Sequence, residues 1–173
     1  VKPNWEIYRA PLELIPSEFQ FDTYREIFET TPIPKYLLNS VIYAVSGSFI
    51  TIFFGLVAAY GLSRHVFAGK RTLLTILLVV QLVPGLVRVI PVFVMMSSLE
   101  LANTRHGIIL LYGAGGIAYA TWFMKGYIDA IPQELDEAAW IDGASKFRTL
   151  WQILMPSLIP GLAALGILQF IAH

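Results

Sequence analysis

The sequence contains no cysteine and few charged residues. The absence of cysteine among its 173 residues excludes disulfides and thiolate sites. Charged residues make up only 14% of the chain, against about 25% in a typical soluble domain. Lys and Arg balance Asp and Glu, 12 against 12, so the net charge is zero. A neutral chain gives no indication of nucleic acid as a partner.

Long apolar runs separate the few charges. Four stretches carry no charged residue: 36–63, 72–87, 107–124 and 149–172. Since a spanning helix needs about 20 mostly apolar residues, these runs predict an all-α, polytopic membrane protein. A buried soluble core would need many more polar faces. The expected spans are 37–62, 72–96 (interrupted by Pro84, Gly85, Arg88 and Pro91), 107–124 and a last run from Pro156.

Residues 1–36 are polar and rich in aromatics. They lack the apolar central region of a signal peptide. Phe21, Tyr24 and Phe28 recur at helical spacing, so 17–28 is expected to form a short amphipathic helix that "TPIPKY" ends. We expect an extracytoplasmic segment 1–36 and a membrane domain 37–173. Because the sequence begins at Val1 and ends beside an apolar run, we take it as a piece of a longer chain.

Lys and Arg in the short loops predict the orientation. Cytoplasmic loops carry an excess of these residues. The 63–71 loop and the 125–152 stretch carry three each, whereas the 97–106 loop carries only Arg105. Two spans separate the first two loops, so they must share a side. We expect both in the cytoplasm, and 1–36 and 97–106 outside.

The third span, 107–124, is rich in glycine and alanine. In lipid, small residues let helices approach closely and pack. One interpretation is therefore tight bundle packing, and the other is a helix that lines or hinges a pathway.

The polar stretch after this span has the pattern of two short helices. Pro132 and three acids suit a helix start, and Gly143 suits its end. Ser145 is a candidate cap for a second helix with an apolar stripe, and Pro156 is expected to mark a bend into the last run. The stripe comprises Phe147, Leu150, Trp151 and Leu154.

Three interpretations of this stretch compete. A plain loop would be shorter and would not need the pattern. A DNA-reading helix-turn-helix is excluded, because 129–142 holds five acids and no base. The third interpretation is a docking element, in which Ala138 and Ala139 permit close approach, Glu137 and Asp142 pair with partner bases, and the apolar stripe anchors in a groove.

The same residues resemble a known family. Glu137-Ala138-Ala139, Gly143 and Ile153 to Pro156 match the EAA signature of bacterial ABC importer permeases, E-A-A-x3-G-x9-I-x-L-P, with Met155 in place of leucine. Nearly the whole chain is similar to the carbohydrate-uptake permeases of the maltose type, second subunit. The stretches that carry this likeness include "LLNSVIYA", "AAYGLSRHVFAGKR", "LVPGLVRVIPVF" and "ILMPSLIPGLAALGILQF".

The resemblance implies a type I ABC importer transmembrane domain of about six spans, of which this chain would lack the first and last. It implies a multi-pass subunit of the bacterial inner membrane that carries a sugar. Its partners would be a second permease, two ATP-binding subunits and an extracytoplasmic solute-binding protein. The cytoplasmic segment 125–156 would couple to the ATPases through Glu137, Ala138, Ala139, Asp142, Gly143 and Pro156. Another solute, such as a phosphorylated polyol or osmolyte, and a non-transport membrane scaffold are the alternatives.

The sequence argues against catalysis in this chain, so ATP and Mg²⁺ are expected on the partner subunits. The "GKR" at Gly69 fails the phosphate-loop pattern, because Arg64 and Arg71 stand where Gly and Ser or Thr are needed. No zinc motif of the HExxH type occurs. We therefore expect no cofactor and no metal in this chain.

Arg88 is the one charge inside a predicted span. An arginine near a helix centre costs about 2.5–3.5 kcal/mol on insertion scales, so it normally faces protein or water. It either reaches the outer headgroups or faces a translocation cavity, where Pro84 would free carbonyls and Gln81 could bind sugar hydroxyls. We therefore name Gln81, Pro84 and Arg88 as a candidate substrate pathway.

Overall fold

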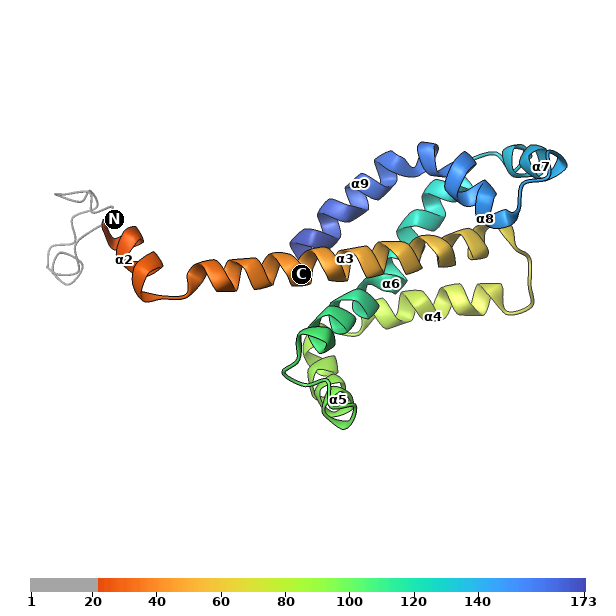
Figure 1. The fold of residues 1–173 in the computed structure, drawn as a ribbon. Helices are drawn as coiled ribbons and strands as arrows, with labels where there is room; N and C mark the ends of the chain where they lie inside the picture. The colour runs from red at the N-terminus through yellow and green to blue at the C-terminus, as the bar shows by residue number, and fades with distance from the viewer. Residues whose placement is uncertain (1–21) are drawn as a thin grey trace, which may run out of the picture. The chain divides into compact units, whose positions relative to one another are not determined.

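The computed structural model describes residues 22–173, whose regular elements are all helical (Figure 1). The all-α prediction is confirmed. The chain divides into two units, Val1–Val41 and Ile42–His173, with the division inside α3. The elements are α2 (Asp22–Thr30), α3 (Ile33–Arg64), α4 (Lys70–Leu82), α5 (Gly85–Ser98), α6 (Arg105–Asp129), α7 (Glu134–Ile141), α8 (Lys146–Arg148), the π-helix η1 (Thr149–Leu154) and α9 (Met155–Ala172). The predicted helix 17–28 is helical from Asp22, and its earlier part lies outside the described residues.

Within residues 22–173, three helical runs are long and apolar enough to cross a membrane. They are Ile33–Arg64, Arg105–Asp129 and Lys146–Ala172. The first two extend beyond the predicted spans at both ends, because a helix continues through polar residues that the hydropathy pattern leaves out. Arg64 therefore ends α3, and its expected place in the loop is wrong.

The predicted span 72–96 is not one straight helix. It consists of α4 and α5, which meet at 101°. Pro84 has no backbone N–H, and its ring holds Val83 in an extended conformation, φ −72° and ψ 118°, which ends α4. Pro91 stays inside α5 without ending it. The pair is a broken span or a re-entrant hairpin.

Glycines of α6 bring it into close contact with α3. A Cβ added at Gly113 would lie 2.6 Å from Ile50, and one added at Gly55 of α3 would lie 2.5 Å from Ala120. Thr51 donates a hydrogen bond of 2.7 Å to the Gly113 carbonyl. Gly115, by contrast, faces open space. The small residues therefore pack on one face of α6 and leave another face open.

The core lies between α3, α6, η1 and α9. It includes Leu56, Met124, Leu154 and Leu165, each at most 1% exposed. In the described part of the chain, α4 and α5 contribute no buried residue. They touch the bundle mainly where α4 packs on α6.

Pro156 does not interrupt the last helical run, which continues from Lys146 to Ala172. The irregularity lies before it, in the π-helix Thr149–Leu154. A proline inside a helix clashes with the carbonyl four residues earlier, and a wide π turn at that carbonyl relieves the crowding. The sequence predicted the disturbance but not its form.

Candidate functional site

The polar stretch folds as the helix, turn and helix that the sequence predicts. Its first helix, α7, has Glu134, Asp136 and Glu137 in its first turn, where acids favour the positive end of the helix dipole. Gly143 follows the helix with φ +81°, a left-handed conformation that suits glycine. The Gly143 N–H donates to the Trp140 carbonyl at 3.0 Å, and the Ala144 N–H to the Ala139 carbonyl at 2.9 Å. These two bonds form a Schellman motif.

Ser145 caps the second helix, as predicted. Its hydroxyl oxygen accepts from the Arg148 N–H at 3.3 Å, and its carbonyl accepts from the Thr149 N–H at 2.8 Å. The turn and the cap thus pair backbone groups at the end of α7 and the start of α8 within the segment itself.

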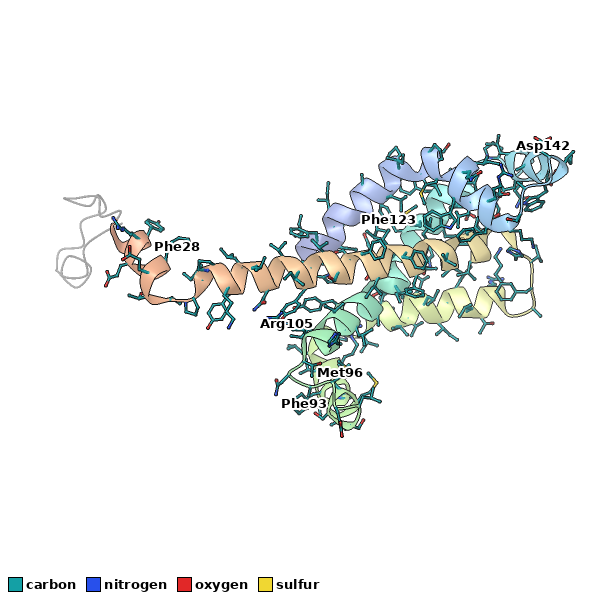
Figure 2. The ribbon with its side chains drawn as sticks, viewed as in Figure 1. Phe28, Phe93, Met96, Arg105, Phe123 and Asp142 are labelled. Carbon is teal, nitrogen blue, oxygen red and sulfur yellow. The ribbon has the colours of Figure 1, made fainter. Side chains whose placement is uncertain are left out.

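The two faces of α7 differ in burial. Asp136 and Ala139 face the bundle and are 1% and 5% exposed. The candidate residues Glu137, Ala138 and Asp142 are exposed, and Figure 2 shows Asp142 at the end of α7. Of the two alanines proposed for close approach, only Ala138 therefore lies on the free face.

The free face of α7 carries large apolar side chains among its acids. Ile141 is 87% exposed, and Leu135 and Trp140 are also exposed. Phe147 of α8 is exposed as well. We call these four residues the apolar end patch.

Most of the predicted apolar stripe of the second helix packs inward instead. Leu150 and Leu154 are buried in the core, and Trp151 stacks on Phe53 of α3 with ring centroids 6.0 Å apart. The expectation that the stripe as a whole docks in a partner's groove is therefore wrong. Its helical spacing did not show which apolar face meets the chain's own core.

A buried ion pair that sequence reasoning missed holds α7 to α3. Arg64 Nε donates to Asp136 Oδ2 at 2.9 Å, and the two side chains are 3% and 1% exposed. Arg64 Nη2 also donates to the Ile131 carbonyl at 2.9 Å, and the Tyr60 hydroxyl donates to Asp136 Oδ1 at 3.2 Å. Asp136 looked like one of several dipole-favoured acids. One signal in the sequence could have indicated the pair: Arg64 is a charged residue directly after a long apolar run, and charged side chains in a span usually pair with one another or with backbone carbonyls.

Further polar contacts gather at the same end. Ser63 and Lys125 both donate to the carboxylate of Asp129, and Lys146 Nζ lies 2.8 Å from His65 Nε2. The 63–71 loop and the 125–152 stretch thus lie together, at the end of α3 where α7 and α8 lie (Figure 1). The prediction that these two loops share a side agrees with this arrangement.

A cavity of about 1140 Å³ opens elsewhere, between α4, α5, α6 and the end of α9. Gln81 and Arg88 both line it, as do Phe93 and Met96 of α5 (Figure 2). Pro84 is not among the lining residues and instead precedes α5 at the break.

The cavity wall holds one unpaired amide. Gln81 Nε2 is buried and has no hydrogen-bond partner among the described residues. Buried polar groups normally have a partner, so this buried amide is an exception beside the cavity. No group of three His, Asp or Glu that could hold a metal occurs in residues 22–173.

The chain is similar in sequence to curated permease proteins. The chain is 34% identical to the diacetylchitobiose uptake system permease protein of Streptomyces coelicolor, over 98% of the chain and 56% of that protein. It is 38% identical to the galactooligosaccharides transport system permease protein of Bacillus subtilis, over 83% of the chain and 52% of that protein. The chain thus spans about half the length of these curated relatives.

A solved structure shares the fold. A chain of a bacterial ABC transporter involved in the import of the acidic polysaccharide alginate matches with a TM-score of 0.84 and 26% identity, over 99% of this chain and 60% of that one. Residues 51–172 match the family described as the binding-protein-dependent transport system inner membrane component. Together with the membrane-length helices and the short helix α7 between them, these matches show that the chain belongs to the family of binding-protein-dependent transport system inner membrane components.

Proposed function

We propose that the chain is part of a permease subunit of an ATP-driven sugar importer in the bacterial inner membrane. The observation that carries this proposal is α7, a helix whose free face carries exposed acids beside the apolar end patch. Its partners would be a second permease subunit, two ATP-binding subunits and an extracytoplasmic solute-binding protein. ATP binding would close the ATPase pair and push on α7. The spans would then open outward to accept sugar.

The chemistry of the free face supports docking to an ATP-binding subunit. Ile141 is 87% exposed at the tip of α7, and exposed acids flank it, Glu137 and Asp142 among them. A helix that lays an apolar side into a groove and pairs its acids with rim bases is a recurrent mode of recognition. ATP and Mg²⁺ would be bound and ATP hydrolysed in the partner, not in this chain.

The test replaces Ile141 with glutamate in the full-length subunit. Val66→Glu is the matched control, because Val66 is 98% exposed in the 63–71 loop at the same end. We expect the ATP-binding subunits to be lost from the purified complex with Ile141→Glu and retained with Val66→Glu. Retention in both variants, with normal uptake, would refute the docking assignment.

The cavity is proposed as part of the sugar pathway. Gln81 and Arg88 line it and carry groups that can bond to hydroxyl groups, and apolar side chains such as Phe93 line it beside them. Gln81→Leu and Arg88→Gln should each lower uptake without loss of the complex. Arg105→Gln is the control, since Arg105 is exposed and does not line the cavity. Unchanged uptake in both cavity variants would remove these residues from the pathway.

The orientation is testable because this chain has no cysteine of its own. In intact cells, a membrane-impermeant thiol reagent should label Ser98→Cys and not Lys146→Cys. Labelling of Lys146→Cys alone would invert the proposed topology. Uptake assays with a phosphorylated polyol or an osmolyte in place of sugar would decide between the proposed solute and the alternatives.

A further inference from the structure

Of the ion pairs among the described residues, only one joins two different helices. Arg25–Glu29 and Lys125–Asp129 each lie within one helix at a spacing of four residues, and their side chains are partly exposed. Arg64–Asp136 links α3 to α7 and is almost completely buried. This pair therefore differs from the others because it joins two helices and because its side chains are buried.

Stability alone is a poor explanation for such a pair. Desolvation of two charges offsets much of their attraction, and a buried pair can often be replaced by apolar residues with little loss of stability. What the pair supplies is a fixed orientation of α7 relative to α3. The guanidinium holds the Asp136 carboxylate and the Ile131 carbonyl at once, both at 2.9 Å, and Tyr60 holds the second carboxylate oxygen.

These bonds fix both the first turn of α7 and the connection that leads into it from α6. Ile131 lies in the connection from α6, and Asp136 lies in the first turn of α7. On its other side, α7 continues into the turn at Gly143. The attachment of α7 to α3 is therefore polar and specific. Toward α8 the chain continues through a backbone turn, and α7 also packs on η1.

The end of α3 is in turn fixed to α6. Ser63 donates to Asp129 in the last turn of α6, and Gly55 packs against Ala120 farther along the same helix pair. Small-residue packing of this kind brings two helices close along their length. A displacement of α7 that pulls on Arg64 would thus move α3 and α6 together.

We propose that Arg64 and Asp136 are the positioning residues through which movement of α7 reaches α3. This inference rests on the proposed function, because it names the route by which the ATPases would drive the spans. Neither residue contacts sugar or nucleotide in this scheme. Each acts by holding α7 in a fixed relation to the helix pair α3 and α6.

The test replaces both charges at once, so that neither is left buried and unpaired. Arg64→Met with Asp136→Leu is made in the full-length subunit, and the complete transporter is reconstituted in vesicles. The control applies the same two replacements to the exposed pair, as Arg25→Met with Glu29→Leu. Two quantities are measured: the stimulation of ATP hydrolysis by the solute-binding protein, and the sugar transported per ATP hydrolysed.

We expect the buried-pair variant to assemble with the ATP-binding subunits but to lose stimulation about tenfold, within the usual range of coupling between sites. Sugar transported per ATP should fall with it. Arg64→Lys keeps the charge but replaces the planar fork, which reaches Asp136 and Ile131 through two nitrogens, with a single nitrogen. This variant should therefore recover only part of the coupling. The control should behave as the wild type.

Normal stimulation and a normal ratio in the buried-pair variant would overturn the proposal, while docking of α7 to the ATPase would stand. If the buried-pair variant does not assemble, Arg64→Lys decides. Normal stimulation and a normal ratio in that variant would overturn the proposal, because the fork that joins α7 to α3 would then have no effect on coupling, and a partial loss would support it. Failure of the proposed function gives a different result, since the ATP-binding subunits would then remain bound to Ile141→Glu.

Discussion

The end where α3, α6 and α7 meet is built differently from the α4–α5 pair. At the first, a buried ion pair and a buried tyrosine join segments far apart in the sequence. In α4 and α5, by contrast, no residue is buried within the described part of the chain, and Leu86 and Ile90 are 87% and 75% exposed. Elements with few buried contacts open at low free-energy cost. The difference in burial indicates a tightly held end and a more loosely held α4–α5 pair beside the cavity.

The tightly held end should be the more sensitive to mutation. Asp136→Ala leaves the Arg64 guanidinium buried without its carboxylate. Breaking such a pair from one side typically costs about 3–5 kcal/mol. We expect a loss of this size in the free energy of unfolding of the purified subunit in detergent. A loss below about 1 kcal/mol would mean that water reaches Arg64 and that the end is less tightly held than described.

The close contact between α3 and α6 offers a matched pair of glycines in one helix. A Cβ at Gly55 would lie 2.5 Å from the Cβ of Ala120, whereas one at Gly61 meets nothing within 4 Å. Gly55→Ala should destabilise the subunit by about 1–3 kcal/mol through overpacking. Gly61→Ala should be neutral or stabilising by up to about 1 kcal/mol, because alanine favours the helix. Equal thermal unfolding of the two variants would contradict the packing.

The turn at Gly143 provides a smaller effect at the same end. Its φ of +81° is a conformation that disfavours side chains, at a cost of roughly 1–2 kcal/mol. Gly143→Ala should lose about that much stability. Gly126→Ala is the control, since Gly126 lies within α6 and a Cβ there meets nothing within 4 Å. An unchanged stability for Gly143→Ala would mean that the turn adopts another conformation.

A substitution in the α4–α5 pair should give the smallest loss of stability. Ile90→Ala removes a side chain that is 75% exposed, and surface substitutions usually change stability by no more than about 0.5 kcal/mol. Thermal unfolding of the isolated subunit checks this value. A loss as large as that for Asp136→Ala would erase the contrast between the two regions.

Local signals in the sequence predicted the elements of the polar stretch well. Gly143 as a helix end and Ser145 as a cap are confirmed, because both depend on residues within one turn. Three of the four predicted spans are confirmed as membrane-length helices for the same reason, since hydropathy is a property of each segment. Pro84 and Gly85 indicated an interruption, but a turn of 101° depends on how the two helices pack and not on the dipeptide.

Contacts between distant segments were not predicted. Arg64 and Asp136 are 72 residues apart, and each has a sufficient local explanation, one as a loop charge and the other as a helix-start acid. The apolar stripe of the second helix was recognised, but its periodicity did not show that Leu150 and Leu154 would pack on the chain's own core. The roles of Gln81, Arg88 and Glu137 stay predictions, because they depend on bound partners and substrate.

The backbone bonds at the turn at Gly143 affect both the association rate and the affinity that a partner can reach. The Trp140 and Ala139 carbonyls and the Arg148 N–H are already paired within the segment. A partner would therefore meet a surface whose shape exists before contact, and little conformational entropy would be lost on association. Binding of this kind needs no slow folding step, so the rate of encounter would be limited by diffusion and orientation.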